Sequence, residues 1–261
     1  MSIASKTAVI SGSTAGIGLA IARAFAKEGC NLLINGFSET AATETERASI
    51  VKNFDVTAIY GAVDMSRPEE IAGMIAHAEN IFGSVDILVN SAGIQFASPI
   101  EDFPIEKWNR MIAINLSSAF HAMRAAIPGM KARGWGRIIN ISPIDALAPS
   151  PFKSAFVAAR NGVAGLTKTA AVELASFGVT VNSITPGYSA AALAGKQISG
   201  ATKANDMAQG QIVHNGRLVS QPNGKSAIAD QVAAMAVFLS SEAASQITGA
   251  DILIDAQSTA E

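Results

Sequence analysis

The sequence predicts a doubly wound α/β domain, in which helices cover both faces of a seven-stranded parallel sheet. Short apolar segments rich in β-branched residues alternate with helical patterns along the whole chain of 261 residues. Hydrophobic residues make up 49% of the chain, which is enough to form one large core. No tandem repeat or low-complexity linker divides the chain, so we expect a single domain over residues 1–261.

The predicted strands are short and apolar on both faces, as strands buried between two helical layers are. They cover residues 7–10, 31–35, 56–63, 85–90, 136–141, 179–184 and 250–255. Helical patterns between them include residues 16–28, 67–82, 105–131, 155–176 and 229–240. Segment 186–228 has no clear period and is too long for an ordinary connection. We expect it to form a substrate lid with short helices of its own.

Composition narrows the classes of partner. The net charge of −2 gives no electrostatic reason to expect nucleic acid or an anionic membrane. No apolar run reaches the length of about 18 residues that a transmembrane helix needs, and the N-terminus lacks the apolar core of a signal peptide. The lone Cys30 and the scattered histidines show no metal-ligand spacing. We therefore expect a cytoplasmic protein with a small-molecule ligand and no metal.

The first strand leads through a glycine-rich turn into a helix, in the stretch VISGSTAGIGLAIARAFAKEG. Gly12 allows the tight exit from the strand, Gly16 lets the backbone approach a pyrophosphate, and Gly18 lets the helix pack closely. The free N–H groups and the positive dipole of the helix then face the anion. At the first junction of an alternating series this pattern predicts a dinucleotide-binding (Rossmann) site, with Thr14 and Ile17 among its contacts.

The second strand bears on the choice of cofactor. A carboxylate at its end would hold the adenosine ribose of NAD, and Arg or Lys would hold the 2′-phosphate of NADP. The strand instead ends with Asn35 and Phe37, with no Arg or Lys nearby in the sequence, which leaves NAD as the expected cofactor. Asp64, after the third strand, either accepts from the adenine amino group or caps the helix that begins near Pro68.

Small residues follow the fourth strand in the stretch VNSAG. Asn90, Ala92 and Gly93 would allow a flat cofactor to lie across the tips of the strands, although a simple tight turn needs the same residues. Both possibilities stay open on the sequence alone.

Taken together, these stretches resemble the short-chain dehydrogenase/reductase family. SGSTAGIG, VNSAG, INLSSAF, GRIINIS, TPGY and ITGADILID carry the resemblance over essentially the whole chain. GIQFASPIEDFPIEKWN, KSAFVAA and AVFLSSEAASQITG narrow it to the NAD-dependent D-3-hydroxybutyrate dehydrogenases within the family. The resemblance implies hydride transfer with a nicotinamide cofactor, and it adds Pro186 and Gly187 of TPGY to the cofactor-binding residues.

The resemblance also implies a catalytic set of Asn, Ser, Tyr and Lys. Asn115 is retained, whereas Pro143, Phe156 and Arg160 stand in place of serine, tyrosine and lysine. In the family the tyrosine hydroxyl exchanges a proton with the substrate oxygen while the hydride moves. Phe156 has no proton to give. Arg160 can hold a ribose or an anion, but it cannot relay a proton.

The residues that bind the substrate carboxylate in this subgroup are only partly present. Gln95 and Lys153 persist. Asp145 stands in place of a histidine, and Tyr188 in place of a tryptophan.

Three hypotheses remain open. The first is an NAD-binding protein without ordinary dehydrogenase activity, assembled as a homotetramer or with a catalytically intact homologue through helices 105–131 and 155–176. The second is an active oxidoreductase whose proton donor is Tyr188 or a re-aimed Ser142. The third is a non-redox enzyme on the same fold. Halohydrin dehalogenases, which are related to the family, use Ser, Tyr and Arg, but they lack the glycine pattern that this chain keeps.

Overall fold

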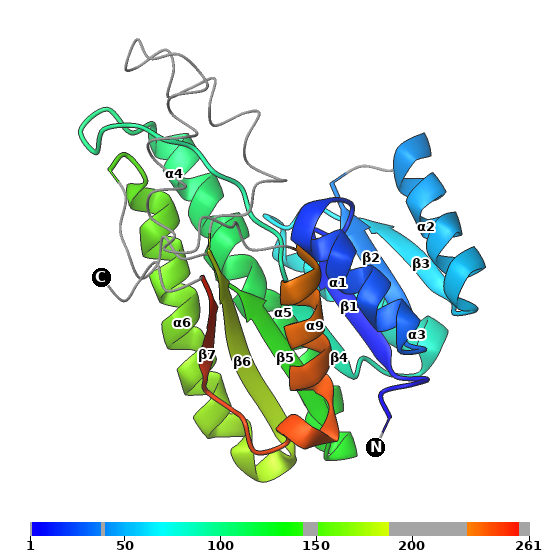
Figure 1. Cartoon of the computed structure of the whole chain (residues 1–261). Helices are drawn as coiled ribbons and strands as arrows, with labels where there is room; N and C mark the ends of the chain where they lie inside the picture. The colour runs from blue at the N-terminus through cyan, green and yellow to red at the C-terminus, as the bar shows by residue number, and fades with distance from the viewer. Residues whose placement is uncertain (1, 38–39, 143–150, 188–228, 256–261) are drawn as a thin grey trace.

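The computed structural model describes residues 2–37, 40–142, 151–187 and 229–255. Within these ranges one parallel sheet lies between two layers of helices (Figure 1). The sheet has seven strands in the order β3-β2-β1-β4-β5-β6-β7, and every neighbouring pair is parallel. The predicted doubly wound α/β fold is therefore confirmed. Three predicted site residues, Pro143, Asp145 and Tyr188, and nearly all of the predicted lid lie outside the described residues.

Each predicted strand is present in the structure. The strands are β1 (Thr7–Ser11), β2 (Asn31–Gly36), β3 (Ala58–Ala62), β4 (Ile87–Asn90), β5 (Gly136–Ile141), β6 (Val179–Pro186) and β7 (Asp251–Ile254). Strands β1, β4, β5 and β6 are buried at every position, because helices cover both faces of the sheet there. This burial explains why apolar residues lie on both faces of these strands rather than at alternate positions.

The helices depart from the predicted pattern at two places. They are α1 (Gly16–Lys27), α2 (Ala41–Phe54), α3 (Pro68–Phe82), α4 (Ile105–Ile112), α5 (Ser118–Arg133), α6 (Ser154–Leu174) and α9 (Ala229–Ser240), with the short helices η1 (Ala113–Ser117), η3 (Ala175–Phe177) and η4 (Glu242–Ala244). The sequence pattern does not reveal α2, because Ile50 is its only buried residue. The helix expected over residues 105–131 is present, but it contains the π-helical turn η1, through which α4 continues into α5.

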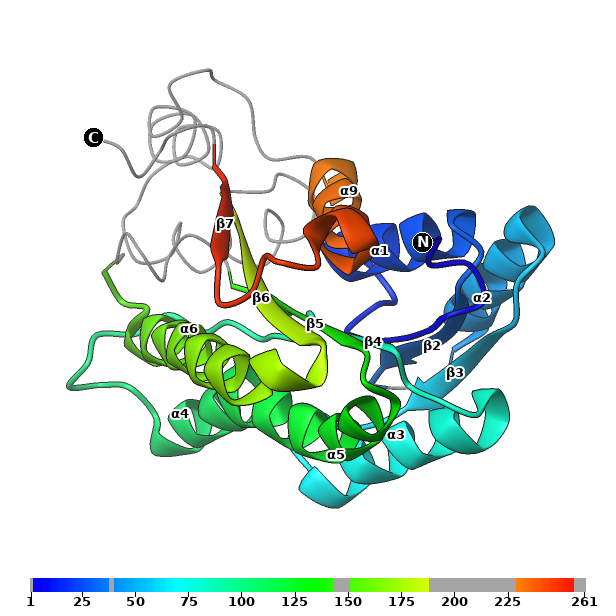
Figure 2. The same cartoon turned by 90° about the horizontal axis from the view of Figure 1, so that it is seen from below.

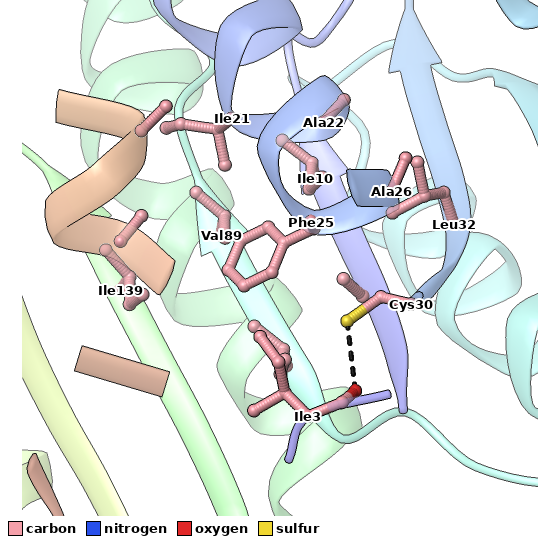
Figure 3. Close-up of a cluster of buried hydrophobic side chains, with 14 of the residues drawn as sticks. Ile3, Ile10, Ile21, Ala22, Phe25, Ala26, Cys30, Leu32, Val89 and Ile139 are labelled. Carbon is pink, nitrogen blue, oxygen red and sulfur yellow. Dashed lines mark hydrogen bonds between the residues drawn. The ribbon is translucent and has the colours of Figure 1, made fainter. Parts of the chain in front are cut away.

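The helices form one layer on each side of the sheet. Helices α1 and α9 pack against each other on one face, and α3, α5 and α6 cover the other face (Figure 2). In the first layer Phe25 lies among Ile21, Val89 and Ile139 (Figure 3). Cys30 is part of this core, and its thiol donates to the carbonyl oxygen of Ile3 at 3.2 Å. The thiol is therefore a core group rather than a reactive one.

The topology places the functional site at the carboxyl edge of the sheet. Strand β1 lies between β2 and β4, so the chain crosses to one side of β1 for β2 and β3 and to the other side for the later strands. Ligands of open α/β sheets bind in the crevice at such a switch point. Among the described residues, the turn after β1 contacts the end of β2 and the loop after β4 at this edge.

Candidate cofactor and active site

The glycine turn after β1 has the backbone that the sequence predicts. Gly12 and Gly16 have φ angles of +64° and +56°, which other residues rarely adopt. A Cβ at Gly12 would lie 2.8 Å from the Cα of Ala92, and a Cβ at Gly18 would collide with the carbonyl oxygen of Gly12. Close packing between the turn, α1 and the loop after β4 thus requires Gly12 and Gly18, and the φ angle favours glycine at position 16.

The first turn of α1 leaves its amide groups available. Ala15 is the residue before the helix, its backbone is extended, and its side chain makes no capping hydrogen bond. No acidic side chain lies in the first turn either. The N-terminal N–H groups of a helix need acceptors, and a pyrophosphate supplies them together with the negative charge that the helix dipole favours. Among the described residues, this end of the crevice therefore fits a dinucleotide.

Two serines that sequence reasoning missed hold the turn in place. The hydroxyl of Ser11 accepts from the amide groups of Ser91 and Ala92, both at 3.1 Å. The hydroxyl of Ser13 donates to the carbonyl oxygen of Ile10 at 2.8 Å and accepts from the amide of Asn35 at 2.8 Å. The hydroxyls on either side of Gly12 were the available signal for this role.

Asn35 supports the turn instead of facing the cofactor, which corrects its predicted role. The side chain is 1% exposed. Its Oδ1 accepts from the amide of Gly12 at 3.1 Å. Its Nδ2 donates to the carbonyl oxygens of Gly61 at 3.0 Å and Val63 at 3.3 Å. Asn35 therefore ties the glycine turn to β3 and is a positioning residue.

Thr14 packs on the end of β2, whereas Ile17 packs on the hydrophobic core. The side chain of Thr14 packs over Gly36, where a Cβ would lie 2.6 Å from the methyl group of Thr14. Gly36 is thus needed for the close approach of the turn to the end of β2. Ile17 is partly buried against the core of the α1 layer.

Near the end of β2 the structure contains a cation that local sequence does not reveal. Phe37 is 68% exposed after β2. The guanidinium of Arg110, from α4, lies 6.0 Å from the centre of the Phe37 ring. The sequence shows no Arg or Lys near the end of β2, but in the folded chain α4 brings Arg110 close to Phe37. The expectation that no Arg or Lys is near the end of β2 is therefore wrong.

Asp64 makes local hydrogen bonds at the end of β3. Its carboxylate accepts from the amide of Ser66 at 2.9 Å and from the hydroxyl of Ser66 at 2.7 Å. The amide hydrogen bond is the main cause that lowers the pKa of Asp64, and Arg110 and Arg67 add to it. The N-cap position of α3 is occupied by Arg67. Asp64 therefore does not cap that helix directly.

Asn115, the retained member of the catalytic set, lies in the π-helical turn η1 and is buried. Its Oδ1 accepts from the amide of Ile94, and its Nδ2 donates to the carbonyl oxygen of Ile94, both at 2.8 Å. Single π-helical turns often occur at functional sites. Here Asn115 holds the loop after β4, because its side chain bonds both the amide and the carbonyl group of Ile94.

A buried chain of amides and a hydroxyl joins the strands to α6. The Nδ2 of Asn90 donates to the Oδ1 of Asn140 at 2.8 Å. The Nδ2 of Asn140 donates in turn to the hydroxyl of Thr167 at 2.8 Å. The predicted cofactor residue Asn90 is thus part of a structural network. Its Oδ1 has no hydrogen-bond partner among the described residues.

Phe156 is a buried core residue at the start of α6. It is 5% exposed and belongs to a cluster with Phe103, Met111 and Ala155. Trp108 packs against this cluster and meets the ring of Phe103 edge-on, with ring centres 6.3 Å apart. The predicted packing of an aromatic ring in this slot is consistent with these contacts. The cluster offers no hydroxyl from Phe156 for proton transfer.

Arg160 lies behind Phe156 and is also buried. Its Nη1 donates to the carbonyl oxygen of Ile141 at 2.8 Å, and its guanidinium carbon is 5.3 Å from the centre of the Phe156 ring. A Cβ at Gly93 would collide with Nη2, so this glycine makes room for the guanidinium. Burial lowers the pKa of Arg160 to about 10, which leaves the group charged at neutral pH.

The position of Ser142 opposes its use as a relocated proton donor. The side chain is 1% exposed, and its hydroxyl donates to the backbone oxygen of Arg160 at 3.5 Å. The hydroxyl therefore lies against the backbone of α6, the helix that carries Phe156 and Arg160, whereas position 143 lies outside the described residues.

The polar residues of the predicted substrate shell lie on segments that border the same region. Both amide atoms of Gln95 and the hydroxyl of Ser154 are buried without a hydrogen-bond partner among the described residues. Lys153 directly precedes α6. Pro186 ends β6, and the amide of Gly187 donates to the carbonyl oxygen of Ile254 in β7 at 2.8 Å.

This fold and this crevice are those of a dinucleotide-dependent oxidoreductase family. Residues 6–201 match the family model described as short chain dehydrogenase. The chain therefore belongs to the short-chain dehydrogenase/reductase family. None of the described helices is long and apolar enough to cross a membrane.

Individual relatives narrow the comparison. The chain is 49% identical over 256 residues to D-beta-hydroxybutyrate dehydrogenase of Rhizobium meliloti, covering 98% of this chain and 99% of that protein. It is 46% identical over 245 residues to D-beta-hydroxybutyrate dehydrogenase of Cupriavidus necator, covering 94% of each. A crystal structure provisionally described as a short-chain alcohol dehydrogenase from Sinorhizobium meliloti matches with a TM-score of 0.88 at 28% identity, covering 99% and 98% of the two chains.

Proposed function

We propose that this protein binds NAD in the manner of its family but does not oxidise D-3-hydroxybutyrate at an ordinary rate. The glycine turn supports the first part. Gly12 and Gly16 have the positive φ angles that such a turn requires. The start of α1 has no side-chain cap, so its amides are available to a pyrophosphate. Hydrogen bonds from Asn35, Ser11 and Ser13 hold the turn in place.

The chemistry supports the second part. A bound nicotinamide supplies or accepts the hydride, and the protein must exchange a proton with the substrate oxygen. Phe156 carries no proton to exchange, and it is packed in an apolar cluster. Arg160 keeps its proton at neutral pH, because burial lowers its pKa only to about 10. The absence of a hydroxyl at Phe156, with a charged guanidinium behind it, is the observation that carries the proposal.

The expected loss of rate is large. Removing one general acid lowers the rate by about 10²–10⁴-fold. Losses at residues that act together do not add, so three replacements do not multiply that factor three times. Ser142 is an unsuitable substitute because its hydroxyl faces the backbone of Arg160. An active enzyme with Tyr188 as its donor is the competing proposal.

Assembly with other subunits is a further part of the proposal. Large apolar side chains are exposed on the helices that the family uses for tetramers: Phe120 on α5 is 47% exposed, and Val172 on α6 is 81% exposed. Covering them in a homotetramer, or in a mixed tetramer with an intact homologue, would remove this apolar surface from water. Light scattering after size-exclusion chromatography measures the stoichiometry, and a monomer would contradict this part.

The experiment measures binding and turnover on the same preparation. We expect NADH and NAD⁺ to raise the thermal midpoint in a saturable way. NADP⁺ is titrated in parallel, because Arg110 lies near Phe37 after β2. We expect no measurable NADH formation from D-3-hydroxybutyrate. The variant Pro143→Ser with Phe156→Tyr and Arg160→Lys is expected to gain that activity. Ordinary turnover by the unaltered protein would contradict the loss of activity, and no thermal shift with any dinucleotide would contradict cofactor binding.

A further inference from the structure

The end of β2 is the place where a dinucleotide site distinguishes NAD from NADP. In a Rossmann fold the adenosine ribose lies beside this strand end, and an arginine nearby accommodates the 2′-phosphate of NADP. The glycine turn contacts the same strand end here, since the amide of Ser13 donates to the carbonyl oxygen of Asn35 at 2.8 Å. The groups around Gly36 and Phe37 therefore decide whether a 2′-phosphate is accepted.

The described residues place no carboxylate at the end of β2 that would hold the ribose and repel a 2′-phosphate. Asn35 is there instead, and its amide is engaged inside the turn and with β3. The first acidic side chain of α2 is Glu44, which accepts two hydrogen bonds from Arg47. Asp64 follows β3 and accepts from Ser66. The usual means of selecting NAD is therefore missing from this part of the structure.

Hydrogen-bond donors border the strand end. A Cβ built on Gly36 would lie 2.7 Å from the hydroxyl of Tyr60 and 3.3 Å from that of Thr14, so both hydroxyls lie over this glycine. Phe37 is the next residue, and the centre of its ring lies 6.0 Å from the guanidinium carbon of Arg110. Hydroxyls and guanidinium groups all donate hydrogen bonds, and arginine is a preferred partner of phosphate. The surroundings of the strand end thus suit an anion.

Arg110 is placed to supply the positive charge. It is an exposed side chain of α4, and it forms none of the ion pairs found within the described ranges. Its distance from the Phe37 ring is at the limit of a cation–π contact, so the ring holds it only weakly. It is also close enough to Asp64 to help lower the pKa of that carboxylate. The guanidinium therefore lies near the ends of both β2 and β3.

We infer that Arg110 is a specificity-determining residue of the cofactor site and that it lets the site bind NADP as well as NAD. The planar guanidinium can donate two parallel hydrogen bonds to the oxygens of the 2′-phosphate. The inference rests on the proposed dinucleotide site and adds the 2′-phosphate to the groups that this site recognises. NADPH affinity should also fall more steeply with salt than NADH affinity, because the additional contact joins exposed charges.

The test is fluorescence titration of the full-length protein with NADPH and with NADH. Calorimetric titration with 2′,5′-ADP and with 5′-AMP, which differ only in the 2′-phosphate, reports the adenosine end alone. We expect NADPH to bind at least as tightly as NADH, and 2′,5′-ADP to bind more tightly than 5′-AMP. Weaker binding of NADPH than of NADH would overturn the inference, including the case in which Glu39, outside the described residues, repels the phosphate.

Variants assign the effect to Arg110. Arg110→Met is expected to weaken NADPH binding about tenfold, because charge-assisted hydrogen bonds are lost, and to leave NADH binding nearly unchanged. Arg67→Met is the matched control, since it also removes an exposed arginine that acts on Asp64, and it should leave both affinities unchanged. Arg110→Lys keeps the charge and should retain part of the NADPH affinity. An equal loss for NADPH and NADH in Arg110→Met, or unchanged NADPH affinity, would overturn the assignment.

The outcomes separate this inference from the proposed function. A protein that binds NADH, but whose affinity for NADPH does not depend on Arg110, contradicts only the inference. A protein that binds none of the four ligands contradicts the proposed cofactor site and the inference with it.

Discussion

The substitution Asn35→Leu tests whether Asn35 supports the glycine turn or contacts the cofactor. The change keeps the size of the side chain and removes its hydrogen bonds. The amide of Gly12 then loses its partner, as do the carbonyl oxygens that share the two hydrogens of Nδ2, which are those of Gly36, Gly61 and Val63. One hydrogen bond to Oδ1 and two from Nδ2 are therefore lost. At about 1 kcal/mol for each hydrogen bond, the free energy of unfolding should fall by about 3 kcal/mol.

The assay is thermal unfolding without cofactor, followed by titration with NADH. For a chain of this size each kcal/mol lowers the midpoint by about 2–4 °C, so we expect a fall of roughly 6–12 °C. NADH should also bind more weakly, because the turn that carries Gly12 is no longer held. Phe37→Ala is the control, since this side chain is 68% exposed, and its midpoint should stay near that of the unaltered protein.

The two roles of Asn35 give different results. Weaker NADH binding at an unchanged unfolding midpoint would refute the positioning role and restore the sequence-based expectation of a direct contact. Loss of stability with weaker binding supports the hydrogen-bond geometry in the structure.

The remaining predictions concern single groups elsewhere. Gly18→Ala should weaken NADH binding in calorimetry, because a Cβ there collides with the carbonyl oxygen of Gly12; equal affinity would contradict the packing. Burial raises the pKa of Cys30 to about 12, so the native thiol stays neutral and its contribution to stability falls as pH rises from 9.0, where the unfolded thiol ionises, toward 12. Native protein should react slowly with Ellman's reagent at neutral pH, and fast reaction would contradict its burial. Hydrogen bonds from Ser66 lower the pKa of Asp64. Asp64→Asn should therefore destabilise the protein at neutral pH, and the loss of stability should shrink as acid protonates Asp64. A stability difference between variant and unaltered protein that grows in acid would contradict this sign.

The fold was predictable because its signals are local and repeated. Each buried strand is a short β-branched run, and the glycine turn marks the first crossover, so strand number and fold class follow from the sequence. The polar helix α2 was not singled out, because its packing depends on Ile50 alone. The π-helical turn at Asn115 was also hidden, because no residue type in the sequence marks the one extra residue of such a turn.

The site was predictable where the backbone conformation requires a particular residue type. It was less predictable where a role depends on how side chains are placed in three dimensions. Gly12 and Gly16 have positive φ angles, and the residue type itself predicts such a backbone. Asn35 was assigned to the cofactor because sequence gives its position at the end of β2 but not the direction of its amide. Arg110 was missed because its approach to Phe37 requires α4 to be placed in three dimensions.

The central claim is that the dinucleotide site persists while proton transfer is lost at Phe156 and Arg160. Stopped-flow measurement with NADH and acetoacetate tests it most directly, because nicotinamide fluorescence reports binding and absorbance reports hydride transfer in one experiment. The account predicts that NADH fluorescence changes on binding and that its absorbance then stays constant. Rapid, complete loss of NADH absorbance after binding would contradict it.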